Sequence, residues 1–387
     1  MKLAVVSHKV CWNSRQAPDF YQTDGGFPFQ IKAISELFDE TRVVVPSENL
    51  RNDKGVSPLV GKSLSVCPLS IPKGKDFRRK LDFPFWLLRN GWLIWREIKN
   101  ADAVHAPIPG DIGTIGMLFA LLLKKPLFVR YCGNWFVRRT LAEAFWKWSM
   151  ERFAGGRNVM LATGGDSSAP SSRNANIKWI FSTSLTKQEI AGAVARRLSE
   201  NSPLKLIIAC RQEKGKGTDI VLESLAQIAE RFPGATLDVI GDGDFLSELK
   251  KRAKILKLED KTIFHGRVEL KRVVELMKQA HVFCYPTESE GFPKVVLEAL
   301  SCGLPVITTR VSVLPRLIGK DCGILLDKPT AEHLTAAIKM ICSDAVTYRR
   351  MSESAIAAAQ EYSLENWRDF IGETLRKSWQ VASLSSV

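Results

Sequence analysis

Short apolar runs alternate with longer amphipathic stretches along most of the chain. The short runs are rich in aliphatic and β-branched residues and predict buried strands, whereas the longer stretches repeat apolar residues with helical spacing. Strands that alternate with helices are typical of βαβ units and a parallel sheet. In the first half of the chain the predicted elements are Leu3–Ser7, Phe27–Phe38, Thr41–Val45, Ala103–His105, Ile112–Leu123 and Leu127–Tyr131.

The second half repeats this alternation with clearer turn signals between the elements. Each predicted strand is followed by a turn and a helical pattern, so a second doubly wound lobe is expected. The predicted strands are Leu204–Ala209, Thr236–Ile240, Ile263–His265, Val282–Tyr285 and Pro305–Thr308. The predicted helices include Asp219–Arg231, Phe245–Leu256 and Leu270–Gln279, followed by Ala331–Ile341, Tyr348–Glu361 and Leu364–Val381.

The boundary between the lobes is predicted from a weakening of the pattern. Residues Gly164–Asn176 are rich in serine, glycine and asparagine and predict a loop. A polar helix is predicted at Lys187–Ser199, and Asn201-Ser202-Pro203 then precedes the first strand of the second lobe. We therefore assign residues 1–200 to the first lobe, 201–363 to the second and 364–387 to a terminal helix.

Length and composition support two soluble lobes. The chain has 387 residues, and a domain usually holds roughly 100 to 200. The content of 45% hydrophobic and 25% charged residues is typical of a globular protein. The net charge of +14 suggests nucleic acid, anionic lipid or phosphorylated small molecules as partners, without choosing among them.

The eight cysteines form no CxxC pair and no Cys/His cluster with zinc spacing. They predict buried thiols in a reducing compartment, without disulfides or a structural metal. The apolar run at the start is too short for a signal peptide, and Gly116–Leu123 is far below the roughly 20 residues of a membrane helix. We expect a cytoplasmic protein that can still contact a membrane surface.

Two carboxylates surround a turn that leads into an apolar helix. Glu290 precedes Gly291-Phe292-Pro293, and Glu298 lies within the helix, which we expect to begin near Pro293 and end near Gly303. Open α/β sheets bind ligands at the carboxyl ends of their strands, and a helix N-terminus attracts phosphate. A structural alternative is a capping box between Thr287 and Glu290, with Glu298 a solvated helix residue.

Two further loops of the second lobe carry glycines at strand ends. Ala209–Asp219 is rich in glycine and lysine, and its Arg211 and Lys216 can reach a neighbouring phosphate, although such a turn is commonly only solvated. Val239–Asp244 contains Gly241 and Gly243. As a dinucleotide fingerprint this second loop is weak, because no third glycine follows at the required place.

Together these segments resemble glycosyltransferase family 4, whose members are retaining enzymes of the GT-B fold that use nucleotide-sugar donors. The matching segments are Arg211–Asp219, Gly241–Gly243, His265–Val268, Glu290–Pro293 and Glu298–Val306. The resemblance implies an α/β protein with two Rossmann-like lobes that face a central cleft. The first lobe would bind the acceptor and the second the donor, with the terminal helix returning to the first lobe.

The resemblance also implies residue roles. Glu290, Arg211 and Lys216 would be catalytic: Glu290 would contact the hydroxyls of the donor sugar, and the two cations the diphosphate. Glu298 would bind the ribose, and the amides after Glu290 the sugar and diphosphate. Thr23–Gly26 resembles the glycine-rich loop beside the donor phosphates, although the long insertion Val10–Gln22 precedes it and a Gly-Gly pair can be only a tight turn. The implied donor-binding set is Gly25, Gly26, Arg211, Lys216, Gly241, Glu290, Gly291, Phe292, Pro293 and Glu298.

The donor would be a UDP-, GDP- or ADP-sugar, and no metal or other cofactor is expected. Fixed cations and a helix N-terminus would stabilise the charge that develops on the leaving diphosphate. In this family retention is usually explained by front-face attack, with the leaving phosphate taking the proton of the acceptor. No enzymic nucleophile is then needed.

The acceptor side departs from the family pattern. Many members carry a histidine at the position that aligns with Cys132, so Asn134 or Trp135 could shape the acceptor pocket instead. The alternative for Cys132 is a buried core cysteine. His105 and His8 lie near strand ends and could line the cleft, although isolated histidines are usually structural.

A basic and aromatic segment of the first lobe suggests a membrane contact. Lys73, Lys75, Arg78 and Arg79 lead into the aromatic residues of Phe83–Trp95, and a second patch follows at Phe136–Arg139 and Phe145–Trp148. This mixture suits anionic headgroups and the acyl boundary. Because the apolar positions of Phe83–Trp95 surround most of a helix, core packing is the alternative. We expect a peripheral protein on the inner membrane face with a lipid-linked acceptor.

The leading hypothesis is a sugar transferase of polysaccharide or glycolipid biosynthesis, with a glycan or lipid-linked glycan as acceptor. Two alternatives share the fold: a catalytically inactive protein that binds nucleotide sugars, because of Cys132, and a nucleotide-sugar 2-epimerase. The epimerase would need acid/base carboxylates in the cleft, for which we find no matching constellation. Nucleic-acid binding would explain the charge, but no matching motif is present.

Overall fold

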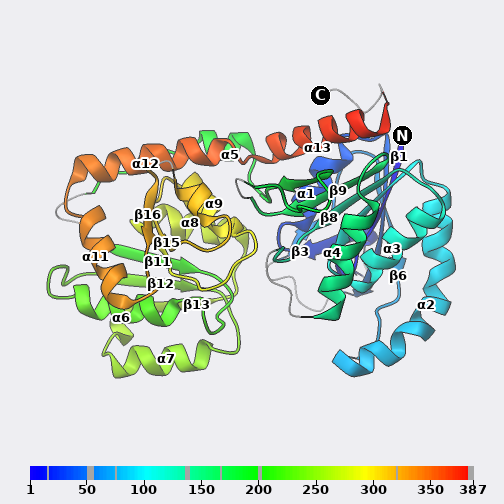
Figure 1. The fold of residues 1–387 in the computed structure, drawn as a ribbon. Coiled ribbons are helices and arrows are strands. Elements are labelled where there is room, and N and C mark those ends of the chain that lie inside the picture. Colours follow the sequence, from blue (N-terminus) through cyan, green and yellow to red (C-terminus); the bar gives the residue numbers. More distant parts are fainter. Residues whose placement is uncertain are drawn as a thin grey trace. The chain divides into compact units, whose positions relative to one another are not determined.

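The computed structural model describes residues 1–14, 17–49, 56–74, 76–135, 140–165, 168–198, 203–319 and 321–381. The chain forms two compact units, which Figure 1 shows as two separate α/β bodies. The first unit consists of Met1–Ser184 together with the segment from Leu364 to the C-terminus. The second unit is Leu185–Ser363.

The first unit is built on a parallel sheet in the order β10-β9-β8-β7-β1-β4, with β6 paired to β4. All residues of β7 and β8 are buried, as expected for strands that helices cover on both faces. The strands are β1 (Lys2–Val6), β4 (Glu40–Asn49), β6 (Leu64–Leu69), β7 (Ala103–Ile108), β8 (Leu127–Tyr131), β9 (Asn158–Thr163) and β10 (Ile177–Ile180).

Three further strands extend this sheet: two come from the insertion after β1, and the third follows β4 in the chain. Strand β2 (Cys11–Ser14) continues beside β4 in parallel and pairs in antiparallel register with β3 (Ala17–Asp24). Strand β3 also pairs with β5 (Val56–Pro58). Helix α1 (Phe27–Ser35) follows after a turn in which Gly25 adopts a φ of +68°, a value that favours glycine.

Helices cover both faces of the first sheet. Successive residues of a strand point to opposite faces, so neighbouring residues pack into different cores. Phe128 of β8 packs into the core that α1 and α13 (Leu364–Trp379) cover, whereas Val129 packs into the core beneath the other three helices. Helix α13 contributes the fully buried Trp367, over which the guanidinium of Arg130 lies 4.8 Å from the ring centroid. The other three helices are α2 (Asp76–Lys99), α3 (Asp111–Leu122) and α4 (Leu141–Phe153).

The second unit has a six-stranded parallel sheet in the order β13-β12-β11-β14-β15-β16 around one core. Its strands are β11 (Lys205–Ala209), β12 (Thr236–Ile240), β13 (Thr262–Gly266), β14 (Val282–Tyr285), β15 (Val306–Thr309) and β16 (Gly323–Leu326). Its helices are α5 (Lys187–Ala191), α6 (Thr218–Ile228), α7 (Leu246–Ile255), α8 (Leu270–Gln279), α9 (Lys294–Ser301), α10 (Leu314–Ile318), α11 (Ala331–Ile341) and α12 (Ala345–Gln360), with a 3₁₀ turn at Glu259–Lys261.

The segment between the units differs from the prediction. The helix expected at Lys187–Ser199 ends at Ala191, and Gly192 caps it. The extended chain that follows belongs to the second unit, because the N–H of Arg196 donates to Oγ of Ser352 at 2.8 Å. The first unit therefore ends at Ser184, earlier than the predicted boundary at residue 200. Residues 199–202 lie outside the described part of the chain.

Candidate functional site

The strand order of the second unit has a topological switch point between β11 and β14. These strands are adjacent, with Leu206 opposite Val282, while β12 lies beyond β11 and β15 beyond β14. The connections that leave the two strands therefore diverge, which is the switch point where open α/β sheets bind ligands. Residues 210–217 follow β11 and residues 286–293 follow β14, so both loops flank this point.

The two loops are in direct contact through their backbones. The N–H of Glu288 donates to the carbonyl oxygen of Gly215 at 2.9 Å. Gly217 has a φ of +86°, and a Cβ at this position would lie 2.5 Å from the carbonyl oxygen of Pro286. Only glycine fits such a close approach, so the glycines of this loop serve to bring Lys216 beside the second loop.

Lys216, Glu290 and Tyr285 form a hydrogen-bonded cluster at the switch point. Nζ of Lys216 lies 2.8 Å from Oε2 of Glu290 and 2.9 Å from the carbonyl oxygen of Ser289. The hydroxyl of Tyr285 donates to the same Oε2, and burial raises its pKa, so it stays a donor. The N–H of Gly291 donates to Oε1 at 3.1 Å. The carboxylate is thus held from both oxygens.

The capping-box alternative for Glu290 is wrong. Helix α9 begins after Pro293, close to the predicted start, and no side chain caps it. The hydroxyl of Thr287 donates instead to the carbonyl oxygen of Ser289 at 3.1 Å. The N–H groups of Lys294 and Val296 donate to the carbonyl oxygens of Phe292 and Pro293 at 3.1 and 3.0 Å, so no side chain occupies this helix N-terminus, whose positive end favours an anion.

Glu298 is a buried carboxyl rather than a solvated helix residue. It is 9% exposed, and burial raises its pKa from 4.5 to about 7, although the charge of Lys294 one turn earlier opposes this shift. A carboxyl with this pKa changes its charge near neutral pH. When ionised, it can accept hydrogen bonds from ligand hydroxyls.

Arg211 is not part of the Lys216 cluster. Its side chain is 79% exposed, and its Nη1 lies 3.0 Å from Oε1 of Glu213 in the same loop. Of the two predicted phosphate ligands, the structure therefore brings only Lys216 next to Glu290.

Gln212, which the sequence analysis missed, holds the loop after β11 in place. The buried amide donates to the carbonyl oxygen of Ile240 at 2.9 Å and accepts from the hydroxyl of Thr218 at 2.7 Å. A Cβ at Gly241 would lie 1.8 Å from the carbonyl oxygen of Cys210. Gly241 therefore lets the turn after β12 pack against this loop. Gln212 stands at a position that the pattern of Arg211–Asp219 leaves open, and Tyr285 lies outside the matching segments, so the sequence marks neither residue.

The acceptor-side candidates divide into core and surface residues. His105 is fully buried, stacks on Phe128 and has its Nδ1 3.0 Å from the carbonyl oxygen of Phe128. Burial lowers its pKa to about 3. Trp135 is also buried and donates through Nε1 to the carbonyl oxygen of Pro170 at 2.6 Å. The prediction that His105 and Trp135 line an acceptor pocket is therefore wrong.

Cys132 and Asn134 lie just after the carboxyl end of β8. Cys132 is exposed, so the prediction of a buried thiol is wrong at this position, and Asn134 is half-buried beside it. Cys210 and Cys342 are half-buried, and the other five cysteines are buried as expected. Gly25 and Gly26 precede α1 in the first unit, so their contact with the donor stays a prediction.

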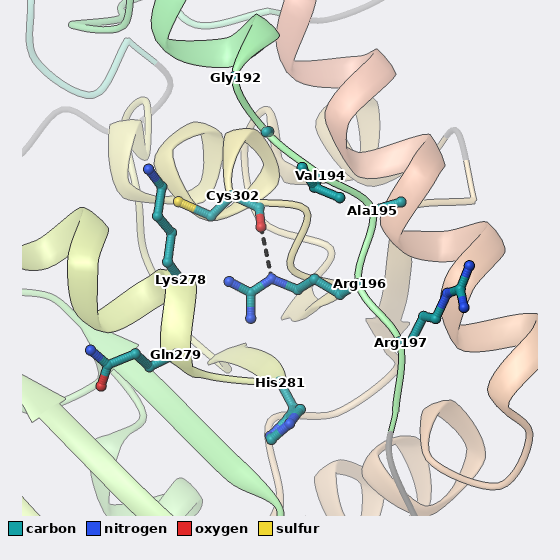
Figure 2. Close-up of a pocket in the computed structure, with 10 residues that line it drawn as sticks. Gly192, Val194, Ala195, Arg196, Arg197, Lys278, Gln279, His281 and Cys302 are labelled. Carbon is teal, nitrogen blue, oxygen red and sulfur yellow. Dashed lines mark hydrogen bonds between the residues drawn. The ribbon is translucent and has the colours of Figure 1, made fainter.

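Figure 2 shows a separate cavity of about 460 Å³ in the second unit, where Arg196 lies between the ends of two helices. Its Nε donates to the carbonyl oxygen of Cys302 at 2.9 Å, and its Nη2 to that of Met277 at 2.9 Å. These carbonyls close the C-termini of α9 and α8, where a cation is favourable. Arg196 therefore stabilises the helix that carries Glu298, and its donors are occupied.

The described residues contain no group of three or more histidine, cysteine, aspartate or glutamate side chains arranged to hold a metal ion. Within the same part of the chain, no helix is both long and apolar enough to cross a bilayer.

Comparison with known proteins identifies the domain that carries this site. Residues 194–358 match the family model described as "Glycosyl transferases group 1". An uncharacterized glycosyltransferase of Haemophilus influenzae is 28% identical over 152 residues, which are 39% of this chain and 42% of that protein. The sulfoquinovosyl transferase SQD2 of Arabidopsis thaliana is 24% identical over 368 residues, 87% of this chain and 66% of that protein. The chain thus spans less than two thirds of either relative.

A solved structure matches over nearly the whole chain. Anabaena Alr3699/HepE, in complex with UDP and glucose, superposes with a TM-score of 0.70 over 97% of this chain and 100% of its own, at 15% identity. At this identity the likeness shows the fold alone. The predicted α/β class with two Rossmann-like units of GT-B type is confirmed.

Proposed function

Because residues 194–358 match the family model of the glycosyl transferases group 1, we propose that this chain is a retaining glycosyltransferase. It moves a sugar from a nucleotide-diphosphate sugar to a glycan or lipid-linked glycan. The observation that carries the proposal is the Lys216–Glu290 pair at the β11/β14 switch point, beside the uncapped N-terminus of α9.

Different groups of the site bind different parts of the donor. Lys216 and the N-terminus of α9 bind the diphosphate, since a helix N-terminus and an ammonium both favour negative charge. Glu290 accepts hydrogen bonds from hydroxyls of the sugar, because Lys216 and Gly291 hold its carboxylate in one orientation. Glu298 accepts the ribose hydroxyls when it is ionised.

The reaction forms the bond between the acceptor oxygen and the anomeric carbon as the bond from that carbon to the diphosphate breaks. Attack from the face of the leaving group retains the configuration, and the departing phosphate oxygen takes the acceptor proton. Lys216 and the N-terminus of α9 stabilise the negative charge that develops on the diphosphate. With these groups in place, we propose that the transfer needs no metal.

Arg211 adds a second cation only if it leaves its present partner. It is largely exposed and lies beside Glu213, so a rotation of its side chain is required before it can contact the diphosphate. We propose that donor binding draws Arg211 away from Glu213, since a diphosphate is a stronger partner than a single exposed carboxylate.

A lipid-linked glycan of polysaccharide or glycolipid biosynthesis, presented at the inner face of a membrane, fits a peripheral enzyme of this charge. Cys132 and Asn134 at the end of β8 are the acceptor-side candidates that are not buried.

A panel of UDP, GDP, ADP and their sugars, read by thermal shift, tests donor binding first. One nucleoside diphosphate and its sugar should raise the melting temperature, and release of the nucleotide from that donor should then be measured with and without EDTA. The absence of any shift would contradict the donor site. A shift without turnover on any glycan would favour the inactive binding protein, and activity that EDTA abolishes would contradict the metal-free mechanism.

A further inference from the structure

Helix α2 carries large apolar residues on two faces, and only one of these faces packs into the core of its own unit. Trp86, Ile94 and Ile98 are buried on the core side. On another side, four large apolar residues recur at helical spacing and remain exposed, and we call them the α2 stripe. They are Leu81 (59% exposed), Phe85 (73%), Leu88 (82%) and Trp92 (71%).

Helix α3 packs next to α2 (Figure 1). Residues of both helices line a groove beside the α2 stripe. It has a volume of about 630 Å³, and its lining is almost entirely apolar. Trp95 of α2 meets Phe119 of α3 edge to face at its base, with ring centroids 5.3 Å apart. Leu122 of α3, 69% exposed, extends the apolar surface. The residues that line the groove are Pro84, Leu87, Leu88, Gly91, Trp92, Trp95 and Phe119.

The charges around the stripe are positive. Arg89 is exposed between Phe85 and Trp92. Arg96 is half exposed one turn beyond Trp92, and its Nη2 lies 2.8 Å from Oε1 of Glu97. Among the described side chains from Leu81 to Arg96, the acidic residue is Asp82, which is half-buried and accepts the N–H of Lys73 at 2.8 Å. An apolar surface of this extent with a cationic rim is typical of an interaction site for an anionic, partly apolar partner.

The structure describes the basic cluster predicted from the sequence only in part. Nε and Nη2 of Arg79 lie 2.9 and 2.7 Å from Oδ2 of Asp111, so this guanidinium is already paired. Lys75, the side chain of Arg78 and the patch Phe136–Arg139 lie outside the described residues. The core-packing alternative holds for one face of α2 only.

We propose that the α2 stripe and its groove dock on an anionic phospholipid bilayer. The stripe enters the interface between headgroups and acyl chains, Arg89 and Arg96 contact lipid phosphates, and the groove takes one hydrocarbon chain of a lipid. The α2 stripe and its groove would form the membrane contact of the proposed function. The inference rests on that proposed function for the lipid-linked acceptor. Aromatic and aliphatic residues with a basic rim match the chemistry of that interface.

The charge pattern favours a bilayer over a second copy of the chain. In a two-fold symmetric dimer the same patch contacts itself, so an interface centred on the stripe would bring Arg89 of both copies together. No acidic side chain described on this face would compensate that repulsion. Anionic headgroups supply the missing charge.

Vesicle co-sedimentation of the full chain tests the surface. Vesicles of phosphatidylcholine with one part in three of phosphatidylglycerol should bind the parent, and binding should weaken with salt because exposed charges are screened. The double variant Phe85→Ser, Trp92→Ser should bind at least tenfold more weakly. Its matched control is Met340→Ser, Val346→Ser, which removes two exposed apolar residues of the second unit and should bind as the parent does.

Trp92→Phe keeps the apolar character and reports on depth of insertion. Vesicles with brominated acyl chains should quench the tryptophan fluorescence of the parent more than that of Trp92→Phe, while both bind equally. Equal quenching would contradict insertion of the stripe. The proposal would be overturned if the parent does not bind anionic vesicles, or if the double variant of the stripe binds them as well as its control does. It would also be overturned if the parent is a dimer and the double variant is a monomer.

The thermal shift with nucleoside diphosphates separates this surface from the transferase function. All four proteins should keep the shift, because none of the substituted residues belongs to the Lys216 cluster. Vesicle binding without any thermal shift by a nucleotide would contradict the donor site and support the membrane surface. A thermal shift without vesicle binding would support the donor site and contradict the membrane surface.

Discussion

The ammonium of Lys216 lies 2.8 Å from Oε2 of Glu290, and the hydroxyl of Tyr285 donates to the same oxygen. Lys216 and Glu290 come from different loops, and each side chain is less than a fifth exposed. An ion pair in this setting is weakly screened by solvent, so it fixes the orientation of the carboxylate that is proposed to hold the donor sugar.

Replacing Lys216 by alanine should weaken binding of the nucleoside diphosphate by about ten- to a hundredfold. A charge-assisted hydrogen bond contributes roughly 1.5 to 3 kcal/mol, and the variant loses such a bond to the diphosphate. Titration calorimetry with the diphosphate that gives the largest thermal shift measures the effect. Lys214→Ala is the control, because Lys214 is exposed in the same loop and should leave affinity unchanged. Equal affinities of both variants would exclude Lys216 as a phosphate ligand.

Tyr285→Phe should lower turnover of the sugar donor about five- to tenfold and leave affinity for the free diphosphate nearly intact. The variant removes one donor from Oε2 of Glu290, at a cost of roughly 1 kcal/mol, and Glu290 contacts the sugar rather than the phosphates in the proposed complex. Tyr348→Phe is the control, since its hydroxyl donates to the carbonyl oxygen of His281 at 2.9 Å elsewhere in the unit. A parallel loss of diphosphate affinity would argue against separate roles.

Nucleotide affinity should rise with pH through about 7. Burial raises the pKa of Glu298 to about 7, and only its ionised form accepts two ribose hydroxyls. Dissociation constants measured from pH 5.5 to 8.5 should show this dependence for the ribonucleotide and lose it for the 2′-deoxy analogue. Glu298→Gln should flatten the profile. A profile that keeps its midpoint in Glu298→Gln would assign the titration to another group.

The same carboxyl should cost stability at alkaline pH. Its pKa is raised on folding from 4.5 to about 7, so its contribution is complete below the unfolded value and is lost as pH rises through the folded value. The loss is of the order of 3 kcal/mol at pH 8. Urea unfolding should therefore find Glu298→Gln more stable than the parent at pH 8 and similar at pH 5. Equal stabilities at both pH values would show that the site solvates the charge.

Arg196→Met should destabilise the second unit by about 3 kcal/mol. It removes the guanidinium that binds the terminal carbonyls of α8 and α9, and hydrogen bonds to a charged group contribute roughly 1.5 to 3 kcal/mol each before relaxation. Arg197→Met controls for loss of charge, because Arg197 is exposed beside it (Figure 2). Arg196→Met should have a lower melting temperature than Arg197→Met. Equal melting temperatures would mean that water replaces the hydrogen bonds of Arg196.

Local patterns were sufficient for the elements and for the chemistry of the donor loops. Apolar runs bounded by turn residues placed β14, and the glycine and proline after α9 placed its end, because backbone propensities act over a few residues. Glu290 and Glu298 were identified by their spacing around a turn that ends a strand. Their environment was not, since no local pattern reveals that Glu298 is almost fully buried.

Only the tertiary structure decided which of these residues act together. Lys216 and Glu290 are 74 positions apart, and they meet because β11 and β14 are neighbours in the sheet. Arg211, in the same loop as Lys216, points away from the cluster. His105 sits at a strand position typical of ligand-binding residues but is enclosed by the core, while one side of α2 stays uncovered. Side-chain burial depends on what packs against each face, and that follows from contacts between distant segments rather than from the local sequence.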